Sequence, residues 1–211
     1  MEPNLGVPLH SCNICSCRKE AGALMCRMAW GDESIRSFGL SNPVYLLCAS
    51  LVDSPEDNVK EEMERLRPRG AFKLHWRDMG DKKRMESVNA ISAFEAMHIV
   101  IAAVRITGCK PERARRKCLE HLLPILEQEG IERFVLESRS HNEDDKDIRC
   151  WQSMRSKGMI ETIRIVHAKG SSNPMLWIPD QVLGAYGDVL AGGTMYAEFI
   201  KHCVLEEIVN V

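Results

Sequence analysis

Short apolar runs alternate with segments of helical spacing along this chain, and no other feature of the sequence restricts its fold as strongly. Runs with the length of buried strands cover 23–32, 44–52, 97–107, 131–136 and 162–167. Residues 68–80 are bounded by Pro and Gly and are expected to form a short strand or extended segment. We expect the early strands to form an antiparallel meander and the later ones to alternate with helices. The pattern therefore predicts an α/β fold, with a mixed five-stranded sheet and helices on both faces.

Helical spacing fills the intervals between these runs. Ser54 provides an N-cap, Pro55 a first-turn proline and Asp57 a capping acid, so a helix is expected to begin after Ser54. Further helices are expected around Trp151 and over 82–96, 110–129, 174–190 and 197–209.

The length of the chain limits the number of domains. A chain of 211 residues is long enough for one well-packed domain, and a second would be crowded. Residues 1–22 show no sustained period, so we expect an irregular leader there and one domain over 23–211.

Several classes of protein are excluded by the sequence. The longest apolar candidate, 97–106, contains His98 and Arg105 and is far shorter than the roughly 20 residues of a membrane span, so no membrane partner is expected. No secretory signal is indicated, and a cytoplasmic location is expected. The net charge of -2 lacks the general basic character of a strong nucleic-acid binder, so any contact with phosphate has to come from local patches.

Three acidic residues stand beside otherwise apolar segments. Asp32 and Glu137 each end an apolar run, and Asp180 lies near the start of a predicted helix. A buried carboxylate is costly unless it is paired or binds a metal ion, so these positions are candidates for a site. Helical spacing places Gly184 and Gly187 on the same side as Asp180, which predicts a close approach between this helix and the sheet. Taken singly, each acid is also compatible with a turn, a helix start or a solvated strand end.

The same acids stand in motifs with a wider resemblance. GDES at 31–34, VLES at 135–138 and LWIPDQVLGA at 176–185 resemble the motifs of the bacterial family called domain of unknown function thirty-eight hundred. KLHW at 73–76 also resembles an element of that family. Its members resemble ribonuclease H and integrases in fold, so the resemblance implies a ribonuclease-H-like domain. It also implies that the first strand, a later strand and the C-terminal helix each supply one acid, at Asp32, Glu137 and Asp180.

Three convergent carboxylates would suit a hard divalent cation. Mg²⁺ and Mn²⁺ prefer carboxylate and water oxygens, and two such ions about 3.5–4 Å apart support phosphodiester cleavage. We therefore expect a metal-dependent nuclease acting on DNA or RNA, with Asp32, Glu137 and Asp180 as catalytic metal ligands. The alternative is a non-catalytic module of the same fold that binds nucleic acid or protein, which the low basic charge keeps open.

Other residues are secondary candidates for this chemistry. Glu33 points away from Asp32 if the strand continues, and His75 is a candidate for substrate contact or proton transfer, although a lone His is more often structural. Four basic residues lie in the first turns of a predicted helix: Arg113, Arg115, Arg116 and Lys117. The helix macrodipole disfavours cations there, so a phosphate backbone is a candidate partner for them. A solvated charged face is the alternative for this group.

The leader contains residues that could bind zinc. Thiolates and imidazole are zinc ligands, and the candidates are His10, Cys12, Cys15, Cys17 and Cys26. Because the pattern lacks a second Cys-x-x-Cys pair, we do not expect Zn²⁺ there. A zinc-dependent regulatory protein built on these cysteines is the third functional alternative.

Overall fold

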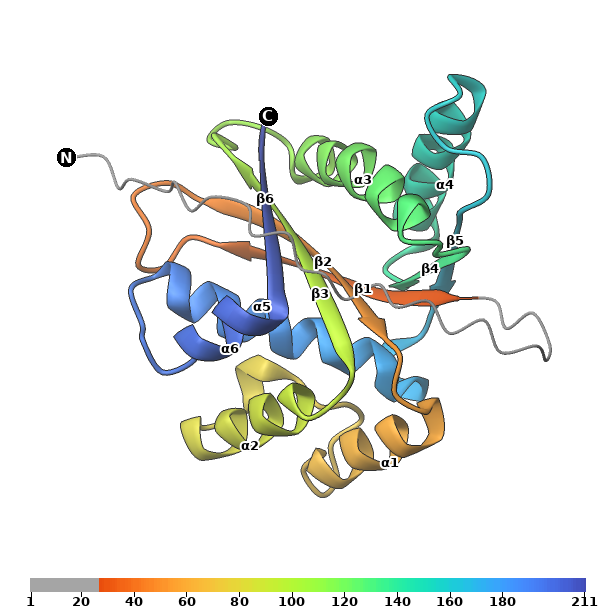
Figure 1. Ribbon diagram of the computed structural model, residues 1–211. Coiled ribbons are helices and arrows are strands. Elements are labelled where there is room, and N and C mark those ends of the chain that lie inside the picture. Colours follow the sequence, from red (N-terminus) through yellow and green to blue (C-terminus); the bar gives the residue numbers. More distant parts are fainter. Residues whose placement is uncertain (1–26) are drawn as a thin grey trace.

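A six-stranded sheet forms the centre of the computed structural model, which describes residues 27–211 (Figure 1). The strands lie in the order β5-β4-β1-β2-β3-β6. Their bounds are β1 (Met28–Arg36), β2 (Val44–Val52), β3 (Ala96–Val104), β4 (Arg133–Glu137), β5 (Arg164–Ala168) and β6 (Val204–Asn210). β1, β2 and β3 form an antiparallel meander, whereas β4, β5 and β6 are each added in parallel to a neighbour.

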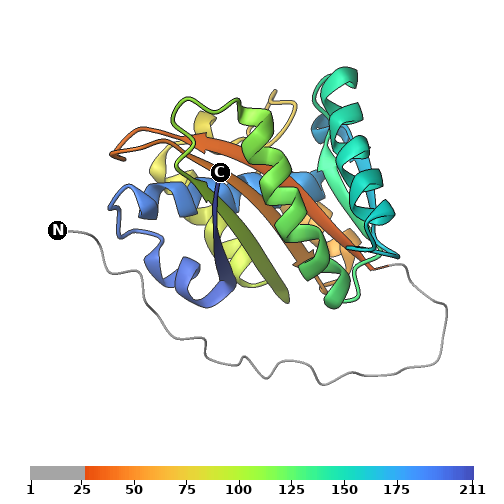
Figure 2. The same ribbon diagram turned by 90° about the horizontal axis from the view of Figure 1, so that it is seen from above.

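Helices cover both faces of this sheet, as the two ribbon views show (Figures 1 and 2). One face packs against α1 (Glu56–Leu66), α2 (Asp81–Ser92), α5 (Trp177–Leu190) and α6 (Ala197–Cys203). The other face packs against α3 (Pro111–Gln128) and α4 (His141–Ser156). Three single 3₁₀ turns complete the structure: η1 (Trp76–Asp78), η2 (Gly170–Ser172) and η3 (Pro174–Leu176). No helix in residues 27–211 is both long and apolar enough to cross a membrane.

The α/β class and the mixed sheet with helices on both faces are confirmed, and the number of strands is corrected from five to six. The extra strand is β6, which lies in the expected helix over 197–209; only its first half, α6, is helical. All residues of 204–210 pair with residues 98–104 of β3. Their backbone groups therefore bond to a neighbouring strand instead of within a helix. Residues 68–80 form a loop and η1 rather than a strand, and the predicted leader 1–22 lies outside the described residues.

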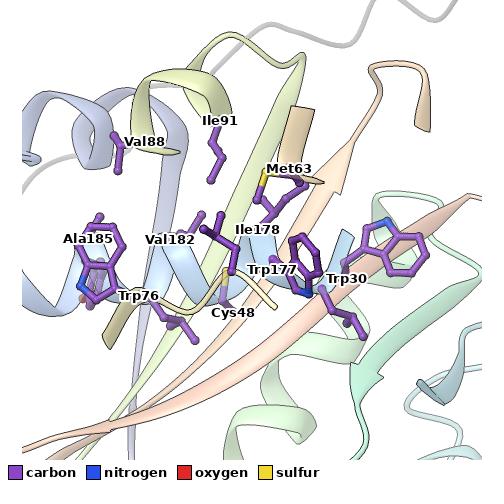
Figure 3. Close-up of a cluster of buried hydrophobic side chains, with 14 of the residues drawn as sticks. Trp30, Cys48, Met63, Trp76, Val88, Ile91, Trp177, Ile178, Val182 and Ala185 are labelled. Atoms are coloured by element: carbon purple, nitrogen blue, oxygen red, sulfur yellow. The ribbon is translucent and has the colours of Figure 1, made fainter. Parts of the chain in front are cut away.

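Close packing against α5 explains the glycines in that helix. Figure 3 shows the buried cluster on this face, in which Trp76 lies among side chains from α5. A Cβ atom at Gly184 would overlap the indole ring of Trp76, and one at Gly187 would overlap the guanidinium of Arg36 on β1. The expected close approach to the sheet therefore holds at Gly187. At Gly184 the neighbour is η1, because Trp76 inserts between α2, α5 and the sheet.

The two glycines predict different costs of an added methyl group. Alanine in a helix is favoured over glycine by about 1 kcal/mol, whereas overpacking a rigid core costs roughly 1–3 kcal/mol. Gly184→Ala must displace a buried indole, so we expect it to lower the free energy of unfolding by about 1 kcal/mol. Gly187→Ala meets the flexible end of an arginine and is expected to be near neutral. Urea denaturation of both variants checks this, and equal effects would refute the packing argument.

Candidate active site

Strand alternation directs two of the predicted acids to the same face of the sheet. Trp30 and Val135 pack in the core under α5, and side chains two residues apart in a strand point to the same face. Asp32 on β1 and Glu137 at the end of β4 therefore face α5, whose first turn carries Asp180. All three acids line one cavity of about 550 Å³, which we call the acid cavity.

The electrostatic state of Asp32 reflects this crowding. Burial raises the pKa of its carboxyl well above the usual value of 3.8, and the charges of Asp180, Glu33 and Glu137 raise it further. A hydrogen bond from the backbone N–H of Glu33 to Asp32 Oδ1, 2.8 Å long, opposes this rise only in part. Within residues 27–211, Asp32 forms no ion pair with a basic side chain. Asp32 is therefore a buried acid whose ionised form has no compensating cation among the described residues.

The KLHW segment at 73–76 supplies partners for the other two acids. Lys73 Nζ donates to both oxygens of Glu137, at 2.8 and 3.0 Å. Burial alone would lower the pKa of Lys73, but the hydrogen bond to Glu137 and the charges of the three acids raise it overall. Sequence reasoning missed Lys73 as a site residue, although its place in the KLHW motif was the available signal.

Asp180 is held by the same segment. The backbone N–H of Trp76 donates to Asp180 Oδ2 at 2.7 Å, and His75 Nδ1 lies 3.0 Å from Asp180 Oδ1. Arg77 Nη2 lies 3.1 Å from His75 Nε2. A guanidinium group only donates, so Nε2 accepts and Nδ1 carries the proton that is donated to Asp180. His75 thus contacts the predicted site, and its observed contact orients a carboxylate.

Glu33 and Arg115 lie on the opposite face of β1 in an ionic network. Arg115 is 1% exposed, and its guanidinium donates to Glu33 Oε2 at 2.5 Å and to both oxygens of Asp147 at 2.7 and 2.8 Å. The prediction that Arg115 contacts nucleic acid is therefore wrong, because the side chain is buried and fully paired. Arg113 and Arg116 are exposed on α3, and Lys117 pairs with Glu120 at 3.1 Å.

A second acidic group lies beside this network. Among the described residues, one set of three possible ligands has its donor atoms within 4.8 Å of one another: Asp144, Asp147 and His167. Both oxygens of Asp147 already accept hydrogen bonds from Arg115. Burial would raise the pKa of Asp147, but these hydrogen bonds outweigh burial and lower the pKa to about 2. Asp144 accepts from the hydroxyl of Ser138 at 2.6 Å. In this structure the group is an ion-pair network whose carboxylate oxygens accept hydrogen bonds from neighbouring side chains.

The acids of the acid cavity are less tightly gathered than that set, and two of them are already paired, Glu137 with Lys73 and Asp180 with His75. Space beside Glu137 is kept open by Gly170, where a Cβ atom would overlap the carboxylate. The residues fit a hard cation, since three carboxylates share the cavity and Asp32 has no cationic partner among the described residues. The predicted zinc ligands Cys12, Cys15, Cys17 and Cys26, with His10, lie outside those residues.

Unpaired hydrogen-bond donors surround the acids. Within residues 27–211, three buried side-chain nitrogens have no hydrogen-bond partner: Arg36 Nε, Trp76 Nε1 and Arg139 Nε. All three side chains line the acid cavity. A buried donor without a hydrogen-bond partner is costly, although Arg139 Nε lies 3.6 Å from Glu33 Oε1.

Comparison with solved structures identifies the fold. The PCNA:RNase HII complex from Archaeoglobus fulgidus contains a chain that matches with a TM-score of 0.53 and 12% identity, over 77% of this chain and 73% of that chain. A mutant protein of Bst-RNase HIII matches with a TM-score of 0.42 and 11% identity, over 84% of this chain and 62% of that chain. No protein-family model and no curated protein matches the sequence. The match to the RNase HII chain shows that this chain has a ribonuclease-H-like fold.

The raised pKa of Asp32 predicts a dependence of stability on pH. Asp32 holds its proton more tightly in the fold than in the unfolded chain, so its ionisation destabilises the fold as the pH rises above the usual value of 3.8. Without added metal, we expect Asp32→Asn to raise the free energy of unfolding at neutral pH, on the order of 1 kcal/mol. The difference from the wild type should vanish near about pH 3, where the carboxyl is protonated in both states.

Urea denaturation in chelator across this pH range is the measurement. Asp53→Asn is the matched control, since Asp53 is 68% exposed and its substitution removes the same charge. A pH-independent effect of Asp32→Asn, or one shared by the control, would contradict the electrostatic interpretation.

Proposed function

We propose that this protein is a metal-dependent nuclease that cleaves phosphodiester bonds of DNA or RNA in the acid cavity. The observation that carries the proposal is the convergence of Asp32, Glu137 and Asp180 on one cavity, with Asp32 lacking a cationic partner among the described residues. A bound cation would stabilise the ionised form of such a buried carboxyl. The ribonuclease-H-like fold supports the proposal by analogy only, since one fold serves several functions.

Asp32, Glu137 and Asp180 would hold Mg²⁺ or Mn²⁺, because all three offer the carboxylate oxygens that these hard cations prefer. When bound, the ion supplies Lewis-acid chemistry that polarises a phosphoryl oxygen and lowers the pKa of water. The motif resemblance of the three acids leads us to include membership of the family called domain of unknown function thirty-eight hundred in this proposal. Glu33 has no part in the site chemistry we propose, since Arg115 holds it on the other face of β1.

Residues of the chain itself would position the phosphate. Arg36 and Arg139 line the cavity, and their guanidinium groups would donate to phosphate oxygens. Lys73 would leave Glu137 when a cation arrives and could then pair with the phosphate, because it lines the same cavity. His75 would keep Asp180 oriented through its Nδ1–H.

A non-catalytic module remains the alternative function, and one observation favours it. The ammonium of Lys73 already neutralises Glu137, as a structural ion pair would in a site that binds no metal. Binding of nucleic acid without cleavage in the presence of Mn²⁺ would support this alternative.

Metal binding and cleavage test the proposed function together. Mn²⁺ at about one hundred times its Kd should stabilise the wild type by about 2.7 kcal/mol, because the ion binds only the folded protein. Asp32→Asn and Asp180→Asn should abolish this stabilisation and the cleavage of labelled DNA and RNA substrates. Asp53→Asn, at an exposed position, should retain both. Unchanged Mn²⁺ binding in both site variants would refute the assignment of the ligands.

Lys73 offers a second test with the opposite sign. Because its ammonium and a bound cation compete for the oxygens of Glu137, Lys73→Met should tighten Mn²⁺ binding roughly fivefold, which corresponds to an ion pair of about 1 kcal/mol. Isothermal titration calorimetry measures this effect. Lys82→Met is the control, since Lys82 is exposed and does not line the cavity. Weaker Mn²⁺ binding in Lys73→Met would mean that Lys73 supports the metal instead of competing with it.

A further inference from the structure

A second cavity lies on the opposite face of the sheet from α5, between α3 and α4. Figure 2 shows these two helices side by side. The cavity has a volume of about 590 Å³, and its polar lining comes from both helices. Its floor includes the buried pair of Arg115 and Asp147.

Exposed cations line both walls of this cavity. We call it the basic cleft and define it by six exposed residues, three before and along α3 and three along and after α4: Lys110, Arg113, Arg116, Lys146, Arg149 and Lys157. The cations before and along α3 are three residues apart, and those along and after α4 are three and eight residues apart, so each row lies near one helical face. The α4 row was not part of the sequence prediction, because its three cations are spread over twelve residues.

Acidic side chains compensate this charge only in part. Glu112 lies 3.7 Å from Lys146, and Glu120 lies 3.6 Å from Arg116. In the described part of the chain, the remaining four cations of the basic cleft form no ion pair. Like charges on facing walls repel one another, and the positive end of the α3 dipole adds to the potential at Lys110. On a chain of net charge -2, this is a local concentration of positive charge that an anionic ligand would stabilise.

The basic cleft adjoins the acid cavity. Arg139 follows β4 directly and lines the acid cavity, and its Nη1 donates to Glu112, a residue of the basic cleft, at 2.8 Å. Arg139 also contacts Asp147 in the floor of the cleft, at 3.4 Å. Arg139 therefore links the linings of the two cavities at the end of β4.

We propose that the basic cleft binds the phosphate backbone of the same nucleic acid whose phosphodiester is held in the acid cavity. This inference rests on the proposed function and adds a second contact surface to it. From Lys146 to Lys157 the row extends about 16 Å along α4, at a rise of roughly 1.5 Å per residue, so it suits a linear polyanion. A concave cleft of this kind does not admit a flat bilayer surface, which argues against lipid headgroups.

Binding without cleavage tests the inference. The wild type and the double variant Arg113→Gln, Arg149→Gln are titrated in chelator with labelled DNA and RNA duplexes of equal length, at several salt concentrations. We expect the variant to bind the better of the two duplexes about tenfold more weakly and its salt slope to fall by about two, one for each lost phosphate contact. The matched control is Arg69→Gln, Lys201→Gln, which removes two exposed cations outside the cleft and should change neither quantity.

The outcomes separate this inference from the proposed function. Mn²⁺ binding should be unchanged in Arg113→Gln, Arg149→Gln, because neither residue lines the acid cavity. Equal losses of duplex affinity in the variant and the control, or no loss in either, would refute the role of the basic cleft. The proposed metal binding and cleavage would still be tested separately by the Asp32 and Asp180 variants. Displacement of the duplex by polyglutamate at equal charge concentration would overturn it in favour of an acidic protein partner.

Discussion

The burial of mutually repelling carboxylates in the middle of the sheet is the constraint around which this structure is arranged. Asp32 faces Glu137 and Asp180 across one cavity, and burial together with these charges raises its pKa. The 73–76 segment offsets part of the repulsion. Lys73 pairs with Glu137, and His75 and the backbone N–H of Trp76 bind Asp180. The same segment packs an indole against α5, so the position of that helix and the charge balance of the cavity depend on each other.

Adjacent residues of β1 organise the two faces of the protein. Side chains alternate along a strand, so Asp32 points toward α5 while Glu33 points toward α3 and α4. There Glu33 meets Arg115, a fully buried cation whose removal would leave unpaired charges, and Asp147 completes the pairing. Arg139 lies between the acid cavity and the basic cleft and forms ion pairs with Glu33 and Asp147 of the network.

Local patterns predicted most elements correctly, and the errors have specific causes. The run over 44–52 is β2 to the residue, since a fully buried central strand is apolar throughout. Residues 204–210 were expected to be helical because apolar side chains at spacings of three and four occur there, yet the open edge of β3 makes strand pairing available. Arg115 and Arg116 are adjacent on α3, but Arg115 faces the core and Arg116 faces solvent. The charge of the side chain does not distinguish a buried arginine from an exposed one.

The sequence by itself determined the α/β class, the acids at strand and helix ends, and the motif order that brought three of them into one hypothesis. Periodicity and the cost of burying a carboxylate are local properties, so they can be recognised without coordinates. Only the tertiary structure decided which cation meets which acid: Lys73 lies 64 positions from Glu137, and Arg115 lies 32 from Asp147. Such pairings follow from how strands and helices stack, and no local pattern encodes the distance between residues so far apart in the chain.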